Sequence, residues 1–93
     1  MNIKRDRLQI IHDILKVIRD KNGTIKPTHI LYKANLSHQM LDEYLNDLIS
    51  RKFVVENIEK KGKTYSLTDK GFNYLSKYNL ITDFIGSFGL DMD

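Results

Sequence analysis

The sequence predicts a mainly α-helical domain with one small antiparallel β-hairpin, an α+β fold class. Apolar residues recur at spacings of three and four in the first half of the chain and again near its end, as is typical of amphipathic helices. Two short runs rich in β-branched and aromatic residues, 53–58 and 63–67, are separated by a basic turn that contains a glycine. Such runs predict two strands joined by a tight turn.

Composition favours a single globular domain. The 93 residues suffice for one small core, and shares of 41% hydrophobic and 29% charged residues are unlike those of a disordered chain. The absence of cysteine excludes a disulfide framework and a thiolate metal site. No apolar run approaches the roughly 20 residues of a membrane span, and the charged start of the chain lacks the apolar core of a signal peptide. We therefore expect a cytoplasmic protein with no membrane partner.

The charge is distributed unevenly along the chain. The net charge is +3, but residues 1–35 carry eight Lys and Arg against three Asp, whereas residues 72–93 carry one Lys against three Asp. Basic side chains therefore gather in the first part of the chain and in the turn of the hairpin. This asymmetry is compatible with one surface that faces phosphates.

Two helices are predicted before residue 35. The first covers residues 4–21 and ends at Asn22-Gly23, because both residues tolerate the left-handed backbone of a helix end. Its apolar stripe consists of Leu8, Ile11, Leu15 and Ile18, broadened by Ile14 and Val17. Residues 24–26 suffice for a single strand-like rung. The second helix covers residues 27–34, since Pro27 suits a first helical position.

A tight turn leads into a third helix. Asn35 ends the second helix, Leu36 fills the turn, and the hydroxyl of Ser37 caps a helix that runs to about Lys52. The apolar face of this helix consists of Leu41, Tyr44, Leu45 and Leu48. Its outward positions are His38, Gln39, Asp42, Glu43, Asn46 and Ser50.

The hairpin and a last helix complete the predicted fold. Gly62 supplies the positive φ of a tight turn. The inward phase of the first strand stays open, because its apolar residues fall on both faces: Phe53, Val54, Val55 and Ile58. Thr68 caps the last helix, with Phe72, Leu75 and Tyr78 on one side. This order is that of a winged helix-turn-helix with an extra C-terminal helix, with a domain over residues 1–78 and an apolar C-terminal extension over residues 79–93.

Several segments resemble the archaeal winged helix-turn-helix family of DNA-binding proteins and transcriptional regulators. They are Arg7 to Leu15, Ile30 to Ser37, Tyr44-Leu45, the hairpin, and Tyr65 to Gly71. The run Ala34-Asn35-Leu36-Ser37 combined with Leu67-Thr68-Asp69-Lys70-Gly71 is fairly specific, and the resemblance covers roughly residues 5–80. It implies a winged helix that binds duplex DNA, often as a homodimer formed through the last helix. Where the family tends to carry basic residues early on its recognition helix, this chain has Gln39, Asp42 and Glu43.

Double-stranded DNA is the expected partner. The first turns of the second helix of a helix-turn-helix reach base edges, and Gln suits adenine. Lysines on a projecting turn can follow a phosphate backbone or enter a minor groove. The candidate DNA-binding residues are Ser37, His38, Gln39 and Asn46 on the third helix, Thr28 and Lys33 on the second, Lys60, Lys61 and Lys63 on the hairpin, and Lys4, Arg5 and Arg7 at the start of the chain. The last three form either a basic arm or only a charged first turn.

The C-terminal extension predicts self-association. Its apolar residues are Leu80, Ile81, Phe84, Ile85, Phe88 and Leu90. They either form a dimer interface with a second copy or fold back onto the core of their own subunit, and we expect the homodimer. Gly86 and Gly89 interrupt this segment, which disfavours a long coiled coil.

No catalytic, metal or cofactor site is predicted, and no small-molecule ligand is evident. The three histidines are dispersed and lack carboxylate or thiolate neighbours at ligand spacing. No nucleophile elbow or Gly-rich phosphate loop occurs. The expected function is that of a homodimeric DNA-binding protein, either a transcriptional regulator or a nucleoid-associated protein. The alternative is a protein-interaction module in a macromolecular assembly, which the outward acidic residues Asp42, Glu43 and Asp47 favour.

Overall fold

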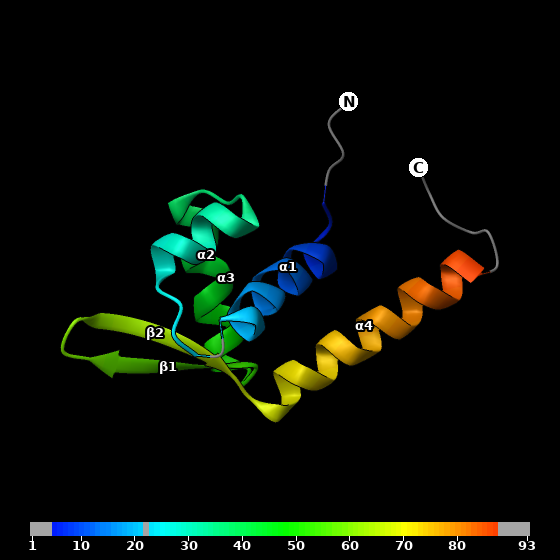
Figure 1. The fold of residues 1–93 in the computed structure, drawn as a ribbon. Coiled ribbons are helices and arrows are strands. Elements are labelled where there is room, and N and C mark those ends of the chain that lie inside the picture. Colours follow the sequence, from blue (N-terminus) through cyan, green and yellow to red (C-terminus); the bar gives the residue numbers. More distant parts are fainter. Residues whose placement is uncertain (1–4, 22, 88–93) are drawn as a thin grey trace.

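The computed structural model describes residues 5–21 and 23–87. Its elements follow the order α1 (Arg7–Asp20), α2 (Pro27–Ala34), α3 (His38–Ser50), β1 (Val54–Glu59), β2 (Gly62–Leu67) and α4 (Asp69–Ser87). Figure 1 shows α1, α2 and α3 gathered together, with the hairpin projecting from one side of them and α4 from the other. The predicted class, a mainly helical winged helix-turn-helix with an extra C-terminal helix, is confirmed.

The core lies between the first three helices and the base of the hairpin. Its most deeply buried side chains are Ile14, Leu15, Ile18, Ile25, Ile30, Leu41 and Leu48. α1 begins later than predicted, because the Asp6 carboxylate accepts a hydrogen bond from the Gln9 N–H at 2.8 Å and caps the helix. Leu8, which the spacing places on the apolar stripe, is 58% exposed, and Ile10 is buried instead. The spacing of apolar residues shows which face of a helix is apolar, but it does not show how far along the helix the other elements pack against that face.

The turn between α2 and α3 forms as its residues predict. Asn35 has φ 56° and ψ 56°, the left-handed conformation that ends a helix. Leu36 is buried, and its N–H donates to the Leu31 carbonyl at 3.0 Å. The Ser37 hydroxyl accepts from the Met40 N–H at 3.2 Å, which caps α3. α3 ends at Ser50, slightly earlier than predicted.

The hairpin pairs β1 with β2 in antiparallel register, from Val54 opposite Leu67 to Glu59 opposite Gly62. Val54 is buried, whereas its neighbour Val55 is 47% exposed. This resolves the phase that the sequence left open. Ile58 lies on the same face as Val54 but is 79% exposed, because it lies towards the tip of the wing, away from the core. Gly62 has φ +127°, as its position in the turn requires. The predicted rung before α2 is confirmed as an isolated bridge between Ile25 and Tyr65.

The segment from Thr68 to Gly71 fastens the start of α4 to the end of α3. The Thr68 hydroxyl donates to the Lys52 carbonyl at 2.5 Å and accepts from the Gly71 N–H at 3.2 Å. The Lys70 ammonium donates to the Arg51 carbonyl at 2.8 Å. A Cβ on Gly71 would lie 2.5 Å from the carbonyl oxygen of Phe53, so only glycine fits this crossing. The glycine in the sequence motif is therefore explained by close backbone packing.

Replacing Gly71 by Ala is expected to destabilise the fold by about 1–3 kcal/mol, because the methyl group overlaps backbone that cannot move freely. In an open helix the same change would stabilise by up to about 1 kcal/mol. The sign of the change in unfolding free energy, measured by urea denaturation, therefore separates close packing from helix propensity. Asn73→Ala, at an exposed position of the same helix, is the control and should change little.

α4 turns a different face inward than the sequence indicates. Leu75 is buried and Tyr78 half-buried, as predicted, but Phe72 is 46% exposed. The reason is that Gly71 occupies the inward position of the first turn. Tyr74 lies inward as well: its ring meets Phe53 edge to face, and its hydroxyl donates to the Leu8 carbonyl at 2.8 Å.

The second half of α4 leaves the core without a break in the helix. The helix continues through residues 78 and 79, where the sequence suggests a boundary. Leu80, Ile81 and Phe84 are 68%, 60% and 60% exposed, so Leu80 and Ile81 are not covered by the core of their own subunit. Phe88 and Leu90 lie outside the described residues. Among the helices within residues 5–21 and 23–87, none combines the length and apolarity needed to cross a membrane.

Candidate nucleic-acid interface

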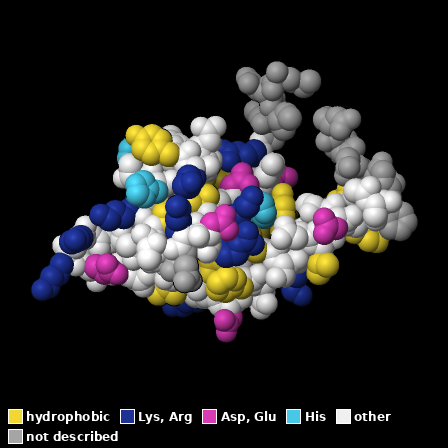
Figure 2. Space-filling model, in the orientation of Figure 1, with side chains coloured by type: hydrophobic (Ala, Val, Ile, Leu, Met, Phe, Trp, Pro, Cys, Tyr) yellow, Lys and Arg dark blue, Asp and Glu magenta, His cyan; other side chains and the backbone are white. Residues whose placement is uncertain are grey.

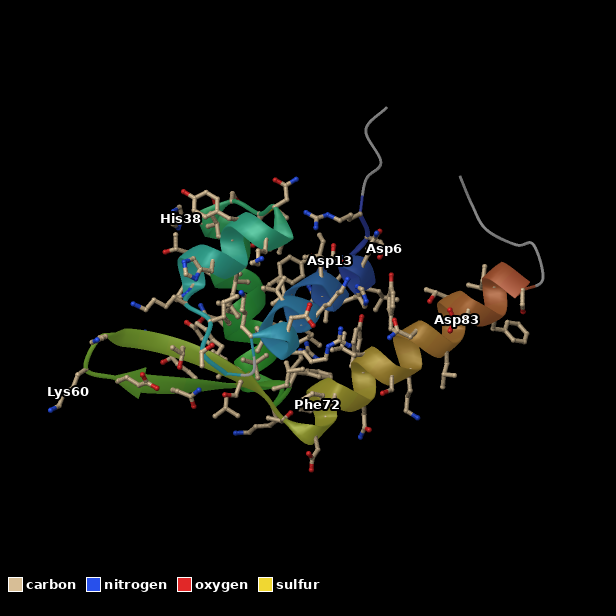
Figure 3. The ribbon with its side chains drawn as sticks, viewed as in Figure 1. Asp6, Asp13, His38, Lys60, Phe72 and Asp83 are labelled. Carbon is tan, nitrogen blue, oxygen red and sulfur yellow. The ribbon has the colours of Figure 1, made fainter. Side chains whose placement is uncertain are left out.

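The start of α3 and the tip of the wing lie on the same side of the molecule. Figure 3 shows His38 and Lys60 at one side and Asp83 of α4 at the other. In Figure 2, Lys and Arg side chains extend from the tip of the wing back towards the helices. This arrangement brings together side chains from two elements that the sequence predicts to meet DNA.

The first turn of α3 presents polar groups to solvent. Ser37, His38 and Gln39 are exposed. The hydroxyl of Ser37 is used as the helix cap, so its hydrogen-bonding capacity is partly committed. The side-chain amide of Gln39 donates to the Glu43 carboxylate at 3.4 Å, a long contact between exposed groups. The N-terminus of a helix also carries unpaired backbone N–H groups and a positive dipole end, which favour anions.

The carboxylates of α3 differ in their surroundings. Asp42 and Glu43 are exposed. Asp47 instead accepts hydrogen bonds from Arg51 at 2.8 Å and from Arg7 at 2.6 Å. These guanidinium groups, Arg51 foremost, lower the pKa of Asp47 against the opposing effect of burial. The acidic character of the outward face is therefore limited to Asp42 and Glu43.

The lowered pKa of Asp47 predicts an acid-dependent contribution to stability. A carboxyl whose pKa is lower in the folded chain stabilises the fold above its unfolded pKa, and that contribution is lost as the pH falls through the folded pKa. We expect Asp47→Asn to lower the melting temperature at pH 7 and the difference from wild type to shrink below about pH 4. Thermal denaturation from pH 7 to pH 3 measures this. Asp83→Asn, which removes an exposed carboxylate from α4, is the control measured alongside it.

The wing carries three lysines in two different situations. Lys60 and Lys61 form the loop between the strands and are exposed. Neither makes an ion pair or side-chain hydrogen bond with another described residue. Lys63 lies 3.7 Å from the carboxylate of Glu56, so its charge is partly neutralised. Lys60 and Lys61 are the cations on the wing that are most available to a phosphate.

The remaining candidates divide into exposed residues and residues with internal partners. Thr28, Lys33 and Asn46 are exposed, as predicted for residues that meet a ligand. Arg5 and Arg7 are not a free arm, because Arg5 bonds to Asp13 and to the end of α2, and Arg7 bonds to Asp47. Lys4 lies outside the described residues.

Sequence reasoning missed Tyr32, which is 74% exposed on α2. The spacing of Ile30, Leu31 and Ala34 already leaves this position outward, and an exposed aromatic ring on such a helix is a reasonable candidate for a contact. His29, three residues earlier on the same helix, is also exposed. His12 is different, because its ring stacks on Tyr78 with the ring centres 4.3 Å apart. Within the described ranges, no three His, Cys, Asp or Glu side chains gather as metal ligands would.

A three-helix core with a helix-turn-helix and an adjacent two-stranded wing defines a winged helix-turn-helix protein. The chain belongs to the winged helix-turn-helix family, whose model matches residues 4–85. It is 38% identical over 76 residues to the uncharacterized protein MJ0290 of the archaeon Methanocaldococcus jannaschii. The match covers 82% of this chain and 33% of that relative, so the chain spans about a third of its length.

Solved structures share the fold at low sequence identity. Sso10a-2, a DNA-binding protein from Sulfolobus solfataricus, superposes with a TM-score of 0.74 at 21% identity, over 96% of this chain and all of that one. The PcaV transcriptional regulator from Streptomyces coelicolor gives a TM-score of 0.76 at 13% identity, over 86% of this chain and 58% of its own. Because the match to Sso10a-2 covers 96% of this chain, it includes most of α4 as well as the winged domain.

Proposed function

We propose that the protein binds double-stranded DNA as a homodimer, as a transcriptional regulator or a nucleoid-associated protein. The observation that carries the proposal is that the exposed lysines of the wing and the exposed first turn of α3 lie on the same side of the molecule, away from α4. The similar structures include proteins described as a DNA-binding protein and as a transcriptional regulator. The site would lie on the side where His38 and Lys60 are found.

In the proposed complex, α3 lies against the major groove and the wing against the flanking backbone. Gln39, His38 and Asn46 are the side chains of α3 that face the bases. Lys60 and Lys61 supply charge to phosphates, and Thr28 and Lys33 of α2 contact the adjacent backbone. Phosphate contacts fix the position of such a protein, and base contacts select its sequence.

The homodimer is proposed from the exposed apolar residues of α4. Leu80 and Ile81 are more than half exposed at neighbouring positions of the helix, with Phe84 one turn further along. Contiguous apolar surface of this kind commonly marks a protein interface. A dimer formed there would present two copies of α3 to half-sites about 34–36 Å apart, or a multiple of that distance.

A protein-interaction module is the second candidate function. The exposed carboxylates of Asp42 and Glu43 favour it, because they lie on the outward face of α3 and would repel phosphates. In that case the outward face of α3 would meet a basic protein surface, and the exposed part of α4 would meet either the same partner or a second copy.

A salt titration of binding to a random-sequence duplex, followed by fluorescence anisotropy, tests the first proposal. We expect an affinity in about the micromolar range that falls linearly with salt on a log–log scale, with a slope of several units. Absence of binding at low salt would rule out a general DNA-coating protein. It would leave a regulator restricted to one operator or the protein-interaction module, which a selection from a random duplex library then separates.

A further inference from the structure

Arg5 connects three segments that are distant in sequence. Its Nη1 donates to a carboxylate oxygen of Asp13 on α1 at 2.8 Å and to the carbonyl of Ala34 at 2.7 Å, and its Nη2 donates to the carbonyl of Asn35 at 2.9 Å. Ala34 is the last residue of α2, and Asn35 is its left-handed cap. The guanidinium therefore lies against the carbonyl groups that end α2, immediately before the turn into α3.

The position of Asp13 is itself fixed from a second direction. Its other carboxylate oxygen lies 3.0 Å from Nδ1 of His12, and the His12 ring stacks on Tyr78 of α4. Figure 3 shows Asp13 projecting from α1. Because α1 belongs to the core, Arg5 ties the end of α2 to a part of the molecule that cannot shift easily.

These contacts leave little of Arg5 for DNA. Its side chain is 25% exposed, and its donors already serve one carboxylate and two carbonyls. The last carbonyls of a helix have no partner within the helix and carry its negative dipole end, so a cation there satisfies both hydrogen bonding and charge. Loss of this cation would free the end of α2 and the turn on which the direction of α3 depends.

We propose that Arg5 is a positioning residue for DNA binding: it clamps the end of α2 to Asp13 and thereby sets the orientation of α3, without touching a phosphate. The inference rests on the proposed DNA-binding function. The clamp and the basic arm differ in two expected results. They predict different effects of Arg5→Ala on the salt dependence of DNA binding, and opposite effects of replacing Asp13 on the affinity for DNA.

The first test measures the affinity of the full chain for the random-sequence duplex as a function of salt. The clamp predicts that Arg5→Ala weakens binding about tenfold, the equivalent of one charge-assisted hydrogen bond, while the slope of log affinity against log salt stays at the wild-type value. A phosphate contact would instead reduce the slope by about 0.9. Arg5→Lys keeps the charge but not the forked donor, so it should also bind more weakly with an unchanged slope. Wild-type affinity of Arg5→Lys, or a reduced slope of Arg5→Ala, overturns the clamp.

The partner residue gives a second test that does not alter Arg5. Asp13→Ala removes a negative charge, so simple electrostatics predicts tighter binding to DNA, whereas the clamp predicts weaker binding. Asp20→Ala is the matched control, because it removes an exposed carboxylate from the same helix that, among the described residues, pairs only with its neighbour Arg19. Weaker binding by Asp13→Ala together with unchanged or tighter binding by Asp20→Ala supports the clamp. Equal effects of the two substitutions overturn it.

Amide hydrogen exchange separates failure of the clamp from failure of the proposed function, because it needs no DNA. The N–H groups of Leu36 and Met40 are bonded within the turn and its helix cap. We expect Arg5→Ala to speed their exchange while that of Tyr65 in the wing stays the same. If the wild-type chain binds no duplex but these amides respond, the DNA-binding proposal fails and the clamp stands as a structural contact. If they do not respond, the clamp itself is wrong.

Discussion

Replacing Lys60 and Lys61 together by Ala is expected to weaken binding to every duplex sequence roughly 10- to 100-fold and to flatten its salt dependence. Both lysines lie in the loop of the wing, exposed to solvent and without an ionic partner among the described residues. If each neutralises one phosphate, the slope of log affinity against log salt falls by about 1.8 for each bound subunit. Fluorescence anisotropy at several salt concentrations measures both quantities.

The charge-matched control is Lys16→Ala with Lys21→Ala, which removes two exposed lysines from α1 and its C-terminal cap rather than from the wing. This double variant should retain most of the wild-type slope. Lys63→Ala should have a smaller effect than either loop lysine, because Lys63 lies beside Glu56. An unchanged affinity and slope in the Lys60/Lys61 variant would show that the wing does not meet the backbone.

Introducing Glu at both Leu80 and Ile81 is expected to convert the proposed dimer into a monomer. The two side chains are 68% and 60% exposed in a single subunit, so charges there should leave the fold intact but would be buried in an interface. Loss of the second subunit should reduce affinity for a two-half-site duplex by about 100-fold or more, because the second contact is no longer intramolecular. Sedimentation velocity and anisotropy report the two effects.

Asn79→Glu with Thr82→Glu adds the same charge at exposed polar positions on the opposite side of α4 and should leave the proposed dimer intact. A wild-type chain that sediments as a monomer at tens of micromolar would contradict the proposed interface. So would a Leu80/Ile81 variant that remains dimeric. In either case the exposed apolar residues would belong to a contact with a different protein.

Local chemistry accounts for the parts of the fold that sequence reasoning predicted. Asn35, Ser37 and Gly62 each act through their own backbone preference or a neighbour a few residues away, so their roles can be deduced from the sequence. The exposed face of α3 follows from the spacing of its leucines. The exposure of the wing lysines is predictable as well, because side chains in a short loop between two strands are rarely covered by other parts of the chain.

Long-range partners account for what sequence reasoning could not predict. The sequence left open whether Arg5 and Arg7 form a basic arm, because, apart from Asp13 on α1, their partners lie 29 or more residues away and nothing in the local pattern indicates them. The exposure of Phe72 depends on the crossing of Gly71 over Phe53, which only the packed structure reveals. The sequence places Asp47 with the outward acidic residues, but in the fold its carboxylate pairs with both Arg7 and Arg51.

α4 runs without a break from Asp69 to Ser87, so its length fixes the distance between the parts of the molecule attached to its two ends. In the proposed dimer, the number of residues between the anchor at Gly71 and the contact at Leu80 sets the distance between the two winged domains and their relative orientation. One residue more would rotate the contact by about 100° and advance it by about 1.5 Å, whereas seven more would keep the face and add about 10.5 Å. That increment is close to three base pairs at about 3.4 Å each. The spacing between the two half-sites in the DNA would thus depend on the length of α4, a helix that does not contact the DNA in the proposed complex.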